Sequence, residues 1–595
     1  MNYKDLADLI FPNAKDISYY EEKYPERNLP EGAIVTRFAP SPTGFVHIGG
    51  LYQALVAKLS ANKTHGVFFL RVEDTDQKRE VENGVTGIVN SLQDFDMTPD
   101  EGMISDIEEI GNYGPYKQSL RKDIYEAYAK YMIEQGKAYP CFATPEELEE
   151  MRAKQEAAKI RPGYYGVWAK YRNLPVDEAM EKIKNGEKYI IRFRSPGRED
   201  RKIKHKDIIK GNVDFPENDQ DIVIIKADGL PTYHFAHAVD DHLMRTTHVI
   251  RSDEWLSSVP LHLQLFQELG FKAPKYAHIS PIMKNDNGNK RKLSKRKDPE
   301  AAVSYYKEEG VPAEAVKEYL LNIANSSFEN WKKANPDKKI EDFDFQLNKM
   351  SVSGALFDMV KLLDIGKTVI SKMTAEEVYE KAYTWAKEYD SELEEMLNDK
   401  EYSLKVFSIE RGNAKPRKDI SKWKEVKNAI IYMYDDKFEK LDLEYADTKI
   451  TDKNEIAKIL KLYLEKYFDY SKENSPNLYD LVSDKKGNCH AFAQLYEKIL
   501  TKLNIPCKSV VSVAMNHQWN IIEINGKWYN VDCSGADLLD SDRDCFFLKS
   551  DLFFGFLGYY NGIAYNNEKA ENTDFVSGDG CLSPIHIFRS VTQRD

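Results

Sequence analysis

Residues 37–50 read RFAPSPTGFVHIGG, a run rich in small residues between an apolar stretch and a helical pattern. The stretch before it, Ala33–Thr36, is typical of a buried strand, and the pattern after it extends from Gly49 to Lys63. Small residues at a strand-to-helix turn let backbone N–H groups approach an anion, and the helix N-terminus adds about half a positive charge. The stretch therefore predicts a phosphate-binding turn. Short apolar strands alternate with helical stretches up to about residue 330, as expected for a doubly wound parallel sheet.

A second motif, KRKLSKRK at 290–297, would bring mobile cations to the same phosphates. Either motif alone is weak, because a short HIGG string or a lysine-rich octamer also arises by chance or as a solvated loop. The order of the two motifs and the sequence between them make the interpretation specific. Four further blocks lie between them: LRVEDTD (70–76), GPYKQS (114–119), LPTYHFAHAVDDH (230–242) and VIRSDEWLSS (249–258).

In this order the blocks resemble the bacterial-type glutamyl-tRNA synthetases, a branch of the class I aminoacyl-tRNA synthetases, over residues 30–330. Glutaminyl relatives carry a Pro-Glu-Pro-Asn core in place of SPTG, so the glutamyl branch is favoured. The resemblance implies that glutamate is activated with ATP, accompanied by Mg²⁺, and is transferred to the 3′ end of tRNA(Glu). Charging of tRNA(Gln) stays open, and a monomer is expected.

The expected fold is α/β, with a class I Rossmann-like catalytic domain over residues 1–330 that carries an acceptor-end-binding insertion at about 115–215. Residues 331–470 turn helical and resemble an anticodon-binding region, which is expected to be truncated because no second anticodon lobe follows. Residues 471–575 predict a small α+β domain, and 576–595 predict an unstructured tail. Whether the two halves are a natural fusion or an assembly artefact stays open.

Composition limits the class of protein. Among 595 residues, 42% are apolar and 30% charged, as in soluble proteins of several domains, and no apolar run approaches the ~18 residues that span a bilayer. Six irregularly spaced cysteines do not form a disulfide framework, which suits a reducing cytoplasm. The net charge of -13 does not exclude tRNA, because binding needs only a local basic surface. We therefore expect a cytoplasmic protein without a membrane partner.

The resemblance also assigns the residues that handle ATP. When the carboxylate of glutamate attacks the α-phosphate, charge grows on the departing pyrophosphate, and the protein supplies positioning and electrostatics. Lys295 is the expected partner of the pyrophosphate, while a core role for His47 is the alternative. The predicted catalytic residues are His47, Gly49, Lys292, Ser294, Lys295 and Arg296, and the predicted ATP contacts are His47, Gly49, Gly50, Glu254 and Lys295.

Selectivity for glutamate over glutamine requires cations at the side-chain carboxylate, and the planar fork of arginine suits this task. Arg37 and Arg251 are the candidates, although Arg37 could instead form an ion pair with Glu73 that only stabilises the fold. By the resemblance, Ser41 and Glu73 help to hold the α-amino and α-carboxyl groups. The predicted glutamate pocket comprises Arg37, Ala39, Ser41, Glu73, Tyr233, His237 and Arg251.

Two further features concern the metal and the tRNA. The acceptor-end insertion holds only Cys141, and one sulfur cannot build a tetrahedral zinc site, so no structural zinc is predicted.

A basic stretch could hold tRNA phosphates or be a solvated helix face. Its members are Arg411, Lys415, Arg417, Lys418, Lys422 and Lys424.

The C-terminal part predicts a Cys-His-Asp triad. Apolar residues recur at helical spacing after Cys489, which places this thiol at a helix N-terminus, where the dipole lowers a thiol pKa. Asn525-Gly526 predicts a two-residue hairpin turn. Pairing across this turn sets Trp519 opposite Asp532 and brings His517 diagonally close to the same carboxylate.

The same segments, DKKGNCHAFAQLYEKILTKLNIPC (484–507) and NHQWNIIEINGKWYNVDCS (516–534), resemble the core of a transglutaminase-like, papain-related domain. The resemblance implies Cys489, His517 and Asp532 as a nucleophile, base and orienting carboxylate. A cysteine hydrolase or transamidase is thus the alternative function, and a tRNA-binding protein without activity is a third. Two structural alternatives also stay open: Cys489 could be an inert buried thiol, and His517 could be a packing residue.

Overall fold

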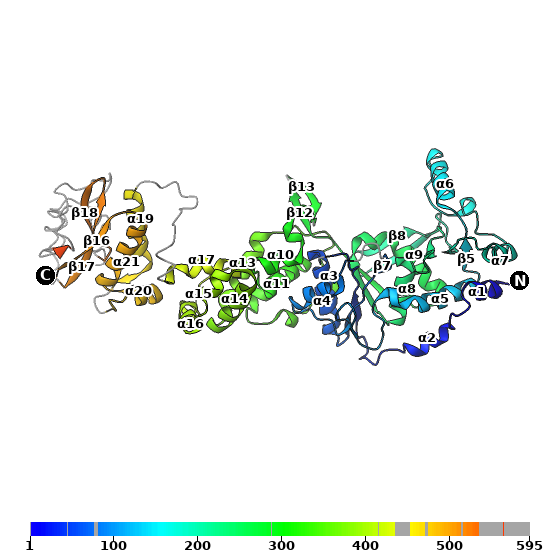
Figure 1. Cartoon of the computed structure of the whole chain (residues 1–595), viewed down its shortest axis with the longest axis horizontal. Coiled ribbons are helices and arrows are strands. Elements are labelled where there is room, and N and C mark those ends of the chain that lie inside the picture. Colours follow the sequence, from blue (N-terminus) through cyan, green and yellow to red (C-terminus); the bar gives the residue numbers. More distant parts are fainter. Residues whose placement is uncertain are drawn as a thin grey trace. The chain divides into compact units, whose positions relative to one another are not determined.

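The computed structural model describes residues 2–44, 46–76, 81–286, 288–294, 296–413, 416–434, 453–470, 474–512, 516–534 and 563–564 (Figure 1). The chain divides into two compact units. One comprises Met1–Ile370 with Ser421–Trp423, and the other comprises Ser371–Ile420 with Lys424–Asp595.

A parallel sheet forms the centre of the first unit. Its strands β1 (Val35–Phe38), β2 (Val67–Leu70) and β3 (Glu101–Met103) run parallel, and β4 (Glu109–Ile110) closes the edge in the antiparallel sense. A second parallel pair, β10 (His248–Ser252) and β11 (Lys275–Ile279), adjoins β1, where the Thr247 N–H donates to the Val35 carbonyl at 3.0 Å. This arrangement confirms the predicted α/β class.

Helices pack around these strands because their apolar residues are buried against them. Helix α3 (Ile48–Lys63) contacts β1, β2 and β10 directly after the predicted turn. The other helices of this part are α1 (Tyr3–Ile10), α2 (Ile17–Lys23), α4 (Gly84–Gln93), α5 (Lys122–Glu134), α8 (Tyr233–Leu243), α9 (Val259–Leu269), α10 (Val303–Glu308), α11 (Ala313–Ala324) and α12 (Ser326–Ala334).

The segment between α5 and α8 interrupts the parallel sheet with antiparallel structure. Strands β5 (Ala138–Cys141), β6 (Ile190–Phe193) and β9 (Val223–Ile225) form one small sheet, and β7 (Lys202–Asp207) and β8 (Gly211–Pro216) form a hairpin. Helices α6 (Pro145–Ala157) and α7 (Val176–Lys184) lie between these strands in sequence. Another hairpin, β12 (Met283–Asp286) with β13 (Asn289–Lys292), leads into the lysine-rich motif.

The region after the catalytic part is helical, as the sequence predicts. Its helices are α13 (Met359–Lys372), α14 (Ala375–Tyr389), α15 (Ser391–Met396), α16 (Lys400–Ser408) and α17 (Val426–Ile430). Helix α14 begins with a capping box in which Thr374 and Glu377 exchange side-chain hydrogen bonds with each other's backbone, and it packs on α15 and α16.

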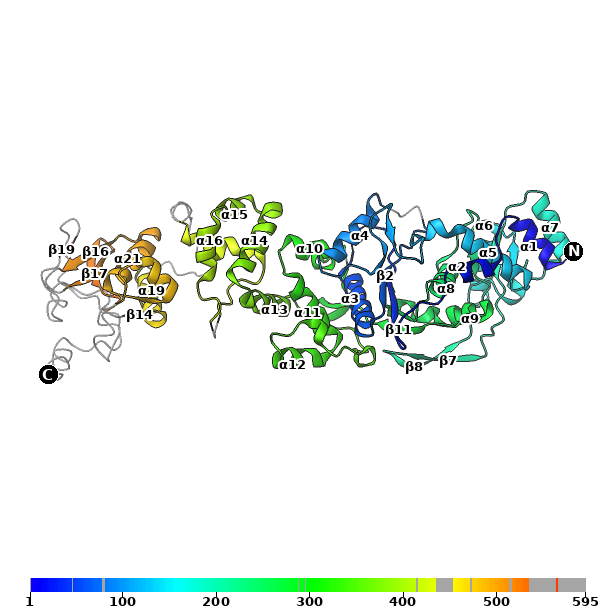
Figure 2. The same cartoon turned by 90° about the horizontal axis from the view of Figure 1, so that it is seen from below.

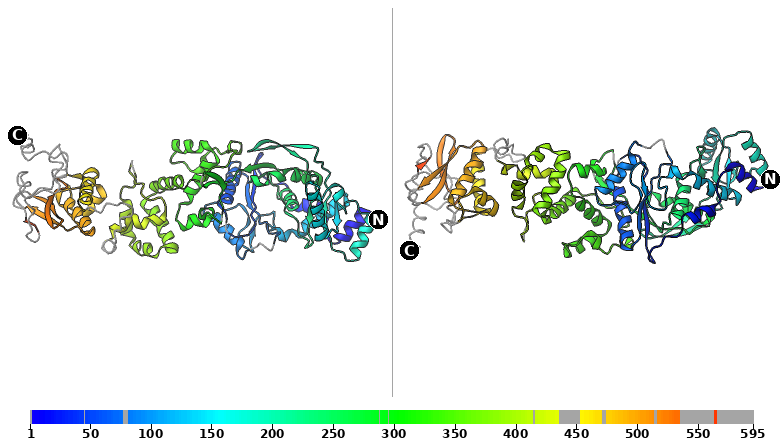
Figure 3. Two further views of the ribbon diagram at one scale, coloured as in Figure 1. Left: turned by 90° about the horizontal axis from the view of Figure 1, so that it is seen from above. Right: turned by 60° about the horizontal axis from the view of Figure 1, so that its bottom comes forward.

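The C-terminal segment is a small α+β structure (Figure 2). Its helices are α19 (Lys453–Tyr467), α20 (Leu478–Asp484) and α21 (Cys489–Lys502), and short strands β14 (Asp469–Tyr470) and β15 (Lys486–Gly487) pair between them. Strands β16 (Cys507–Ser512), β17 (His517–Ile524), β18 (Lys527–Val531) and β19 (Ile563–Ala564) form an antiparallel sheet in the order β18-β17-β16-β19. The strands lie beside the helices in both views of Figure 3.

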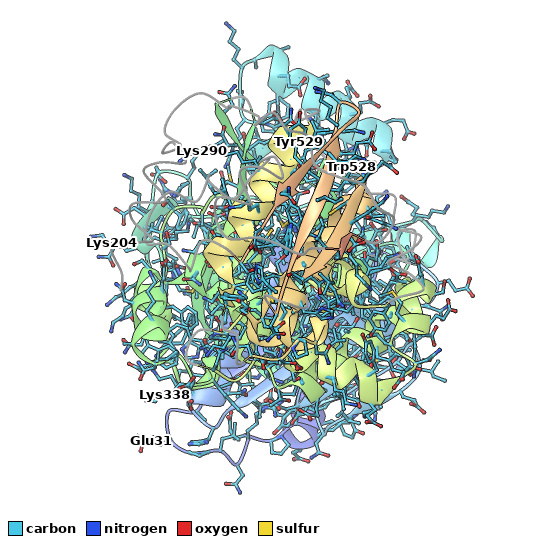
Figure 4. All side chains as sticks on the ribbon, turned by 90° about the vertical axis from the view of Figure 1, so that its left-hand side faces the viewer. Glu31, Lys204, Lys290, Lys338, Trp528 and Tyr529 are labelled. Carbon is cyan, nitrogen blue, oxygen red and sulfur yellow. The ribbon has the colours of Figure 1, made fainter. Side chains whose placement is uncertain are left out.

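Helix α19 belongs to this C-terminal core, although the sequence placed residues up to 470 with the helical region. Ala457 and Leu464 are buried in one cluster with Phe492 and Tyr496, and the Tyr496 hydroxyl donates to the Ala457 carbonyl at 2.9 Å. Trp528 and Tyr529, labelled in Figure 4, lie on the edge strand β18, where the Lys508 ammonium sits 4.8 Å from the Trp528 ring centre. The part of the chain described here contains no helix long and apolar enough to cross a membrane.

Candidate active sites

The phosphate-binding turn ends at His47, which is the N-cap of α3. Its Nδ1 accepts a hydrogen bond from the Gly49 N–H at 2.9 Å, so the proton lies on Nε2, which donates to the Leu293 carbonyl at 3.3 Å. Leu293 belongs to the lysine-rich motif. The imidazole thus contacts both sequence motifs, which the prediction of a shared phosphate site requires.

A cavity of about 210 Å³ opens at this junction. Residues of both motifs line it, together with residues at and just after the end of β10: His47, Gly49, Gly50, Ser252, Glu254 and Lys292. A Cβ atom at Gly49 would lie 3.2 Å from the His47 Nδ1, and one at Gly50 would lie 3.4 Å from the Phe38 ring. A side chain at either position would therefore crowd a neighbouring ring, and both glycines line the cavity.

The lysine-rich loop is organised by Asp298, which sequence reasoning missed. Its carboxylate accepts from both terminal nitrogens of Arg291, at 2.6 and 2.8 Å, and from the Ser294 N–H at 2.9 Å. The hydrogen bonds from Arg291 hold the pKa of Asp298 below its usual range, despite its burial. Asp298 directly follows the KRKLSKRK motif, which was the available signal.

The predicted cations of this loop differ in their surroundings. The Lys292 ammonium donates to Glu254 at 2.5 Å, and both side chains are about half exposed, 49% and 59%. Arg296 is exposed. Lys295, the expected partner of pyrophosphate, lies outside the described residues.

Arg251 is a buried cation with neutral partners. Its side chain is 3% exposed, and its guanidinium donates to the His278 Nε2 at 3.0 Å, the Tyr233 hydroxyl at 3.3 Å, the Trp255 carbonyl at 3.2 Å and the His262 Nδ1 at 3.2 Å. The ring of Tyr276 lies 4.9 Å from the guanidinium carbon. None of its recorded partners among the described residues is a carboxylate. A buried charge without a counter-ion is costly, so the arrangement favours an anionic ligand.

Arg37 has a different environment, because it pairs with Asp241 at 3.2 Å. Asp241 also accepts from Arg71 at 2.7 Å, and Arg71 in turn reaches Glu73 at 3.1 Å. The alternative in which Arg37 pairs with Glu73 is therefore replaced by a buried cluster of two arginines and two carboxylates. Asp241 and Arg71 were both missed, although each lies within a quoted sequence block.

Glu73 lies at the edge of this cluster, with 10% of its side chain exposed. Burial raises its pKa, and the charges of Arg71 and Arg37 only partly oppose this shift. Its N–H donates to the Pro40 carbonyl at 3.0 Å, which brings Glu73 beside the Ala39–Ser41 segment. Ala39 is half-buried and Ser41 is exposed, so this part of the predicted pocket faces solvent.

His237 and Tyr233 lie one helical turn apart on α8. Tyr233 stacks on His237 with ring centres 5.9 Å apart. His237 itself is fully buried, with Nδ1 2.6 Å from Asp241 and Nε2 2.9 Å from the Tyr276 hydroxyl. Burial lowers its pKa to about 3, so it is neutral near pH 7. His237 thus supports the pocket from behind, whereas Tyr233 contacts Arg251 directly.

In the acceptor-end insertion, Cys141 is buried and its thiol donates to the Tyr164 hydroxyl at 3.4 Å. The described residues contain no group of three or more potential metal ligands from His, Cys, Asp and Glu. The absence of structural zinc stays a prediction.

Several members of the basic stretch take part in contacts within the protein. Arg411 donates to the carbonyls of Phe407 and Met373, at 2.9 and 3.2 Å, and Arg417 pairs with Asp419. Lys422 pairs with Glu309. Lys415 lies outside the described residues. These contacts reduce the number of cations that tRNA could use here.

The C-terminal triad is brought together by α21 and the β17–β18 hairpin. Cys489 is the first residue of α21, whose N-cap Asn488 accepts from the N–H groups of His490 and Ala491. The register pairs Asn520 with Val531, which sets Trp519 beside Asp532 one step further on. His517 Nε2 lies 2.7 Å from the Asp532 carboxylate.

The electrostatics of the triad favour an ion pair. Burial opposes charge on Cys489, but hydrogen bonding to His517 and the charge of that imidazole lower its pKa overall. Burial likewise disfavours the charged form of His517, yet the hydrogen bonds to Asp532 and Cys489 raise its pKa to about 10. The Asp532 carboxylate is in turn held by the N–H and hydroxyl of Ser534, at 2.8 and 2.7 Å.

Comparisons with known proteins match two parts of the chain. Residues 33–398 match the family of class I tRNA synthetases (E and Q), catalytic domain, and residues 443–533 match the transglutaminase-like superfamily.

Curated relatives include a glutamate–tRNA ligase of Clostridium perfringens, 53% identical over 484 residues that cover 81% of this chain and 88% of the relative. One of Acetivibrio thermocellus is 50% identical over 78% of this chain and 85% of the relative.

A crystal structure of a glutamate tRNA ligase from Elizabethkingia meningosepticum, in complex with its amino acid, superposes with a TM-score of 0.60 at 29% identity. The match covers 78% of this chain and 92% of that one. The family model matches more than half of the chain, and relatives that are 50–53% identical are covered over 85–88% of their length. The chain therefore belongs to the glutamate–tRNA ligase family of class I tRNA synthetases.

Proposed function

We propose that this protein activates glutamate with ATP and transfers the glutamyl group to the 3′ end of tRNA(Glu). The observation that carries the proposal is Arg251, a buried cation with neutral partners one residue before Ser252, which lines the cavity at the phosphate turn. An anionic side chain bound at Arg251 would place the reacting carboxylate toward the phosphates.

The phosphates of ATP would lie at the N-terminus of α3, where Gly49 and Gly50 line the cavity and the helix dipole favours negative charge. His47 supplies an Nε2–H beside this site. Lys292 and Lys295 would neutralise the departing pyrophosphate, with Ser294 and Arg296 in the same loop.

Mg²⁺ would accompany the phosphates. The Glu254 carboxylate in the cavity suits such a cation, which commonly takes one or two protein carboxylates in addition to phosphate oxygens. The ion would supply charge neutralisation on the phosphate oxygens.

Around the amino acid, Arg251 and Arg37 would hold the side-chain carboxylate, and Tyr233 would form the wall. Glu73, beside the Ala39–Ser41 segment, would hold the α-amino group. His237 keeps Tyr233 and Asp241 in place.

The resemblance of the sequence to the family supports a division of the chain into functional regions. Residues 1–330 would form the catalytic domain, with the insertion at about 115–215 holding the acceptor end. The helical region from residue 331 to 434 would contact the anticodon arm, because α19 belongs to the C-terminal core. We propose a cytoplasmic monomer, with tRNA(Gln) as a further substrate to be tested.

The test is ATP–pyrophosphate exchange by the full chain with glutamate, in the presence and absence of tRNA, followed by esterification of tRNA(Glu) and tRNA(Gln) transcripts. Glutamine in place of glutamate is the control. Lack of glutamate-dependent exchange with tRNA present would reject the proposal.

A second function is favoured by the geometry of Cys489, His517 and Asp532. We propose that this site forms a thioester with a carbonyl substrate: the Cys489 thiolate attacks, the His517 imidazolium gives its proton to the leaving group, and water or an amine then releases the acyl group. Labelling of Cys489 by a thiol-reactive acyl probe, absent in Cys489→Ala, would support it. Equal labelling of both proteins would reject it.

A further inference from the structure

The guanidinium of Arg251 is held between two imidazoles. Its Nε donates to the His278 Nε2 at 3.0 Å, and one terminal nitrogen donates to the His262 Nδ1 at 3.2 Å. Because arginine can only donate, both ring nitrogens that face it must be unprotonated. The tautomer of each histidine therefore decides whether Arg251 can occupy this position.

Asp207 sets the tautomer of His278. Its Oδ2 lies 2.6 Å from the His278 Nδ1, so the proton resides there and Nε2 stays bare. The other oxygen of Asp207 accepts from the N–H groups of Ile209 and Lys210, at 2.9 and 2.8 Å. These backbone donors lie in the β7–β8 turn and fix the orientation of the carboxylate.

His278 is fully buried, and burial lowers its pKa. Burial disfavours the charged form of Asp207, but the hydrogen bonds from His278 and the backbone lower its pKa overall. The pair is therefore an ionised carboxylate behind a neutral imidazole.

This arrangement orients Arg251 without neutralising it. Arg37 and Arg71 both contact the Asp241 carboxylate directly, at 3.2 and 2.7 Å. The Asp207 carboxylate, in contrast, contacts His278, and the imidazole of His278 separates it from Arg251. A carboxylate in direct contact would already satisfy the charge of Arg251. A neutral glutamine side chain would then bind nearly as well as an anionic one.

We propose that Asp207 and His278 are positioning residues that give the pocket its preference for an anionic side chain, by presenting Arg251 in a fixed orientation with its charge uncompensated. The proposal rests on the proposed function, in which Arg251 binds the side-chain carboxylate of glutamate. It adds that selectivity depends on the β7–β8 turn, which lies in the predicted acceptor-end insertion.

Three variants test the role. In His278→Leu the acceptor for the Arg251 Nε is lost, while in His278→Gln an amide oxygen can replace it. In Asp207→Asn the amide can donate to His278 Nδ1, which would move the ring proton to Nε2. The His278 Nε2–H and the Arg251 Nε–H would then be two donors facing each other, and their hydrogen bond would be lost. Tyr128→Phe is the control, because the buried Tyr128 also loses a hydrogen bond to a carboxylate, that of the partly exposed Glu21 at 2.7 Å, and no contact joins Tyr128 to Arg251.

The measurements are KM for glutamate, KM for ATP and kcat in pyrophosphate exchange with tRNA, and the ratio of kcat/KM for glutamate to that for glutamine. For His278→Leu and Asp207→Asn we expect KM for glutamate to rise about 10- to 100-fold, the scale of one hydrogen bond to a charged group, and the ratio to fall similarly. KM for ATP and kcat should change less than about threefold. His278→Gln should recover most of the loss, and Tyr128→Phe should behave as wild type.

The outcomes separate the two proposals. If the wild-type chain shows no glutamate-dependent exchange, the proposed function fails. If wild type is active but both His278→Leu and Asp207→Asn keep its KM for glutamate and its selectivity, the inference is overturned. A parallel rise of both KM values, or no recovery in His278→Gln, would also overturn it, because a purely structural role predicts those results. Should His278→Leu fail to fold, the nearly isosteric Asp207→Asn decides.

Discussion

The imidazole of His47 donates to the carbonyl of Leu293 at 3.3 Å, although the two residues lie 246 positions apart in the chain. This contact joins the N-terminus of α3 to the lysine-rich loop. Lys292 of that loop lines the cavity at the helix terminus, where the phosphates of ATP are proposed to bind. The loop should therefore affect the chemical step more than the initial binding of ATP.

Lys295→Ala should lower kcat for glutamate activation by roughly 10²- to 10³-fold, the usual effect of removing one group that stabilises developing charge. KM for ATP should change much less, because the charge on pyrophosphate grows only as it departs. Steady-state pyrophosphate exchange separates the two effects. Lys297→Ala removes an exposed cation two residues away and is the matched control. A Lys295→Ala variant with near-normal kcat and only a raised KM for ATP would contradict this role.

Arg251→Gln should lose glutamate activation, because a buried carboxylate without its cation costs several kcal/mol. Weak activation of glutamine should appear in its place, since the introduced amide can pair with the amide of glutamine. The measurement is pyrophosphate exchange with each amino acid in turn. Arg152→Gln, an exposed position on α6, controls for the loss of one positive charge. Normal charging of glutamate by Arg251→Gln would mean that the pocket lies elsewhere.

How much of these sites could be predicted depended on whether the partners were neighbours in sequence. His47 at a helix start follows from a local strand-to-helix pattern, and the hairpin at Asn525-Gly526 specifies the register that sets Trp519 beside Asp532. The cluster of Arg37, Arg71 and Asp241 could not be derived in this way. Its members come from β1, the residue after β2, and α8, and which carboxylate compensates which arginine depends on their packing.

The histidines around Arg251 show the same limit. His278 and His262 were not predicted as site residues; in the sequence they stand among the apolar residues of β11 and α9. Their role as acceptors becomes visible only when the tautomers are worked out from Asp207 and His234, whose Nδ1 lies 2.9 Å from the His262 Nε2.

Binding of tRNA should be weak, strongly salt-dependent and poorly responsive to anticodon changes. Phosphate contacts give salt-dependent affinity with little sequence information, and Arg411, Arg417 and Lys422 already bind groups within the protein. Filter binding of tRNA(Glu) transcripts at several salt concentrations, with substitutions at the third anticodon base, measures both properties. Lys418→Ala should reduce affinity equally for all transcripts. A large loss of affinity caused by the third anticodon base alone would show that a complete recognition surface is present.

Cys489 should be the fastest-reacting of the described cysteines at pH 6. Its thiolate is stabilised by His517, whose pKa of about 10 keeps the imidazolium charged from acid pH up to that value, so the ion pair persists between the lowered pKa of Cys489 and about pH 10. Cys507 has the opposite environment, because burial raises its pKa. An ordinary thiol loses reactivity roughly tenfold per pH unit below its pKa, and because the pKa of Cys489 is lowered, its rate should fall less between pH 8 and pH 6 than the rate of an ordinary thiol.

Brief iodoacetamide treatment followed by mass-spectrometric mapping measures the rate at each cysteine. His517→Ala should slow Cys489 most at pH 6, and Asp532→Asn should slow it less, because the imidazole stays in place but its charged form loses a hydrogen bond of 2.7 Å. Cys533 is buried and serves as an internal reference, while Cys545 lies outside the described residues. If Cys489 reacts no faster than Cys533, or is indifferent to the loss of His517, the three side chains do not act as a nucleophilic site.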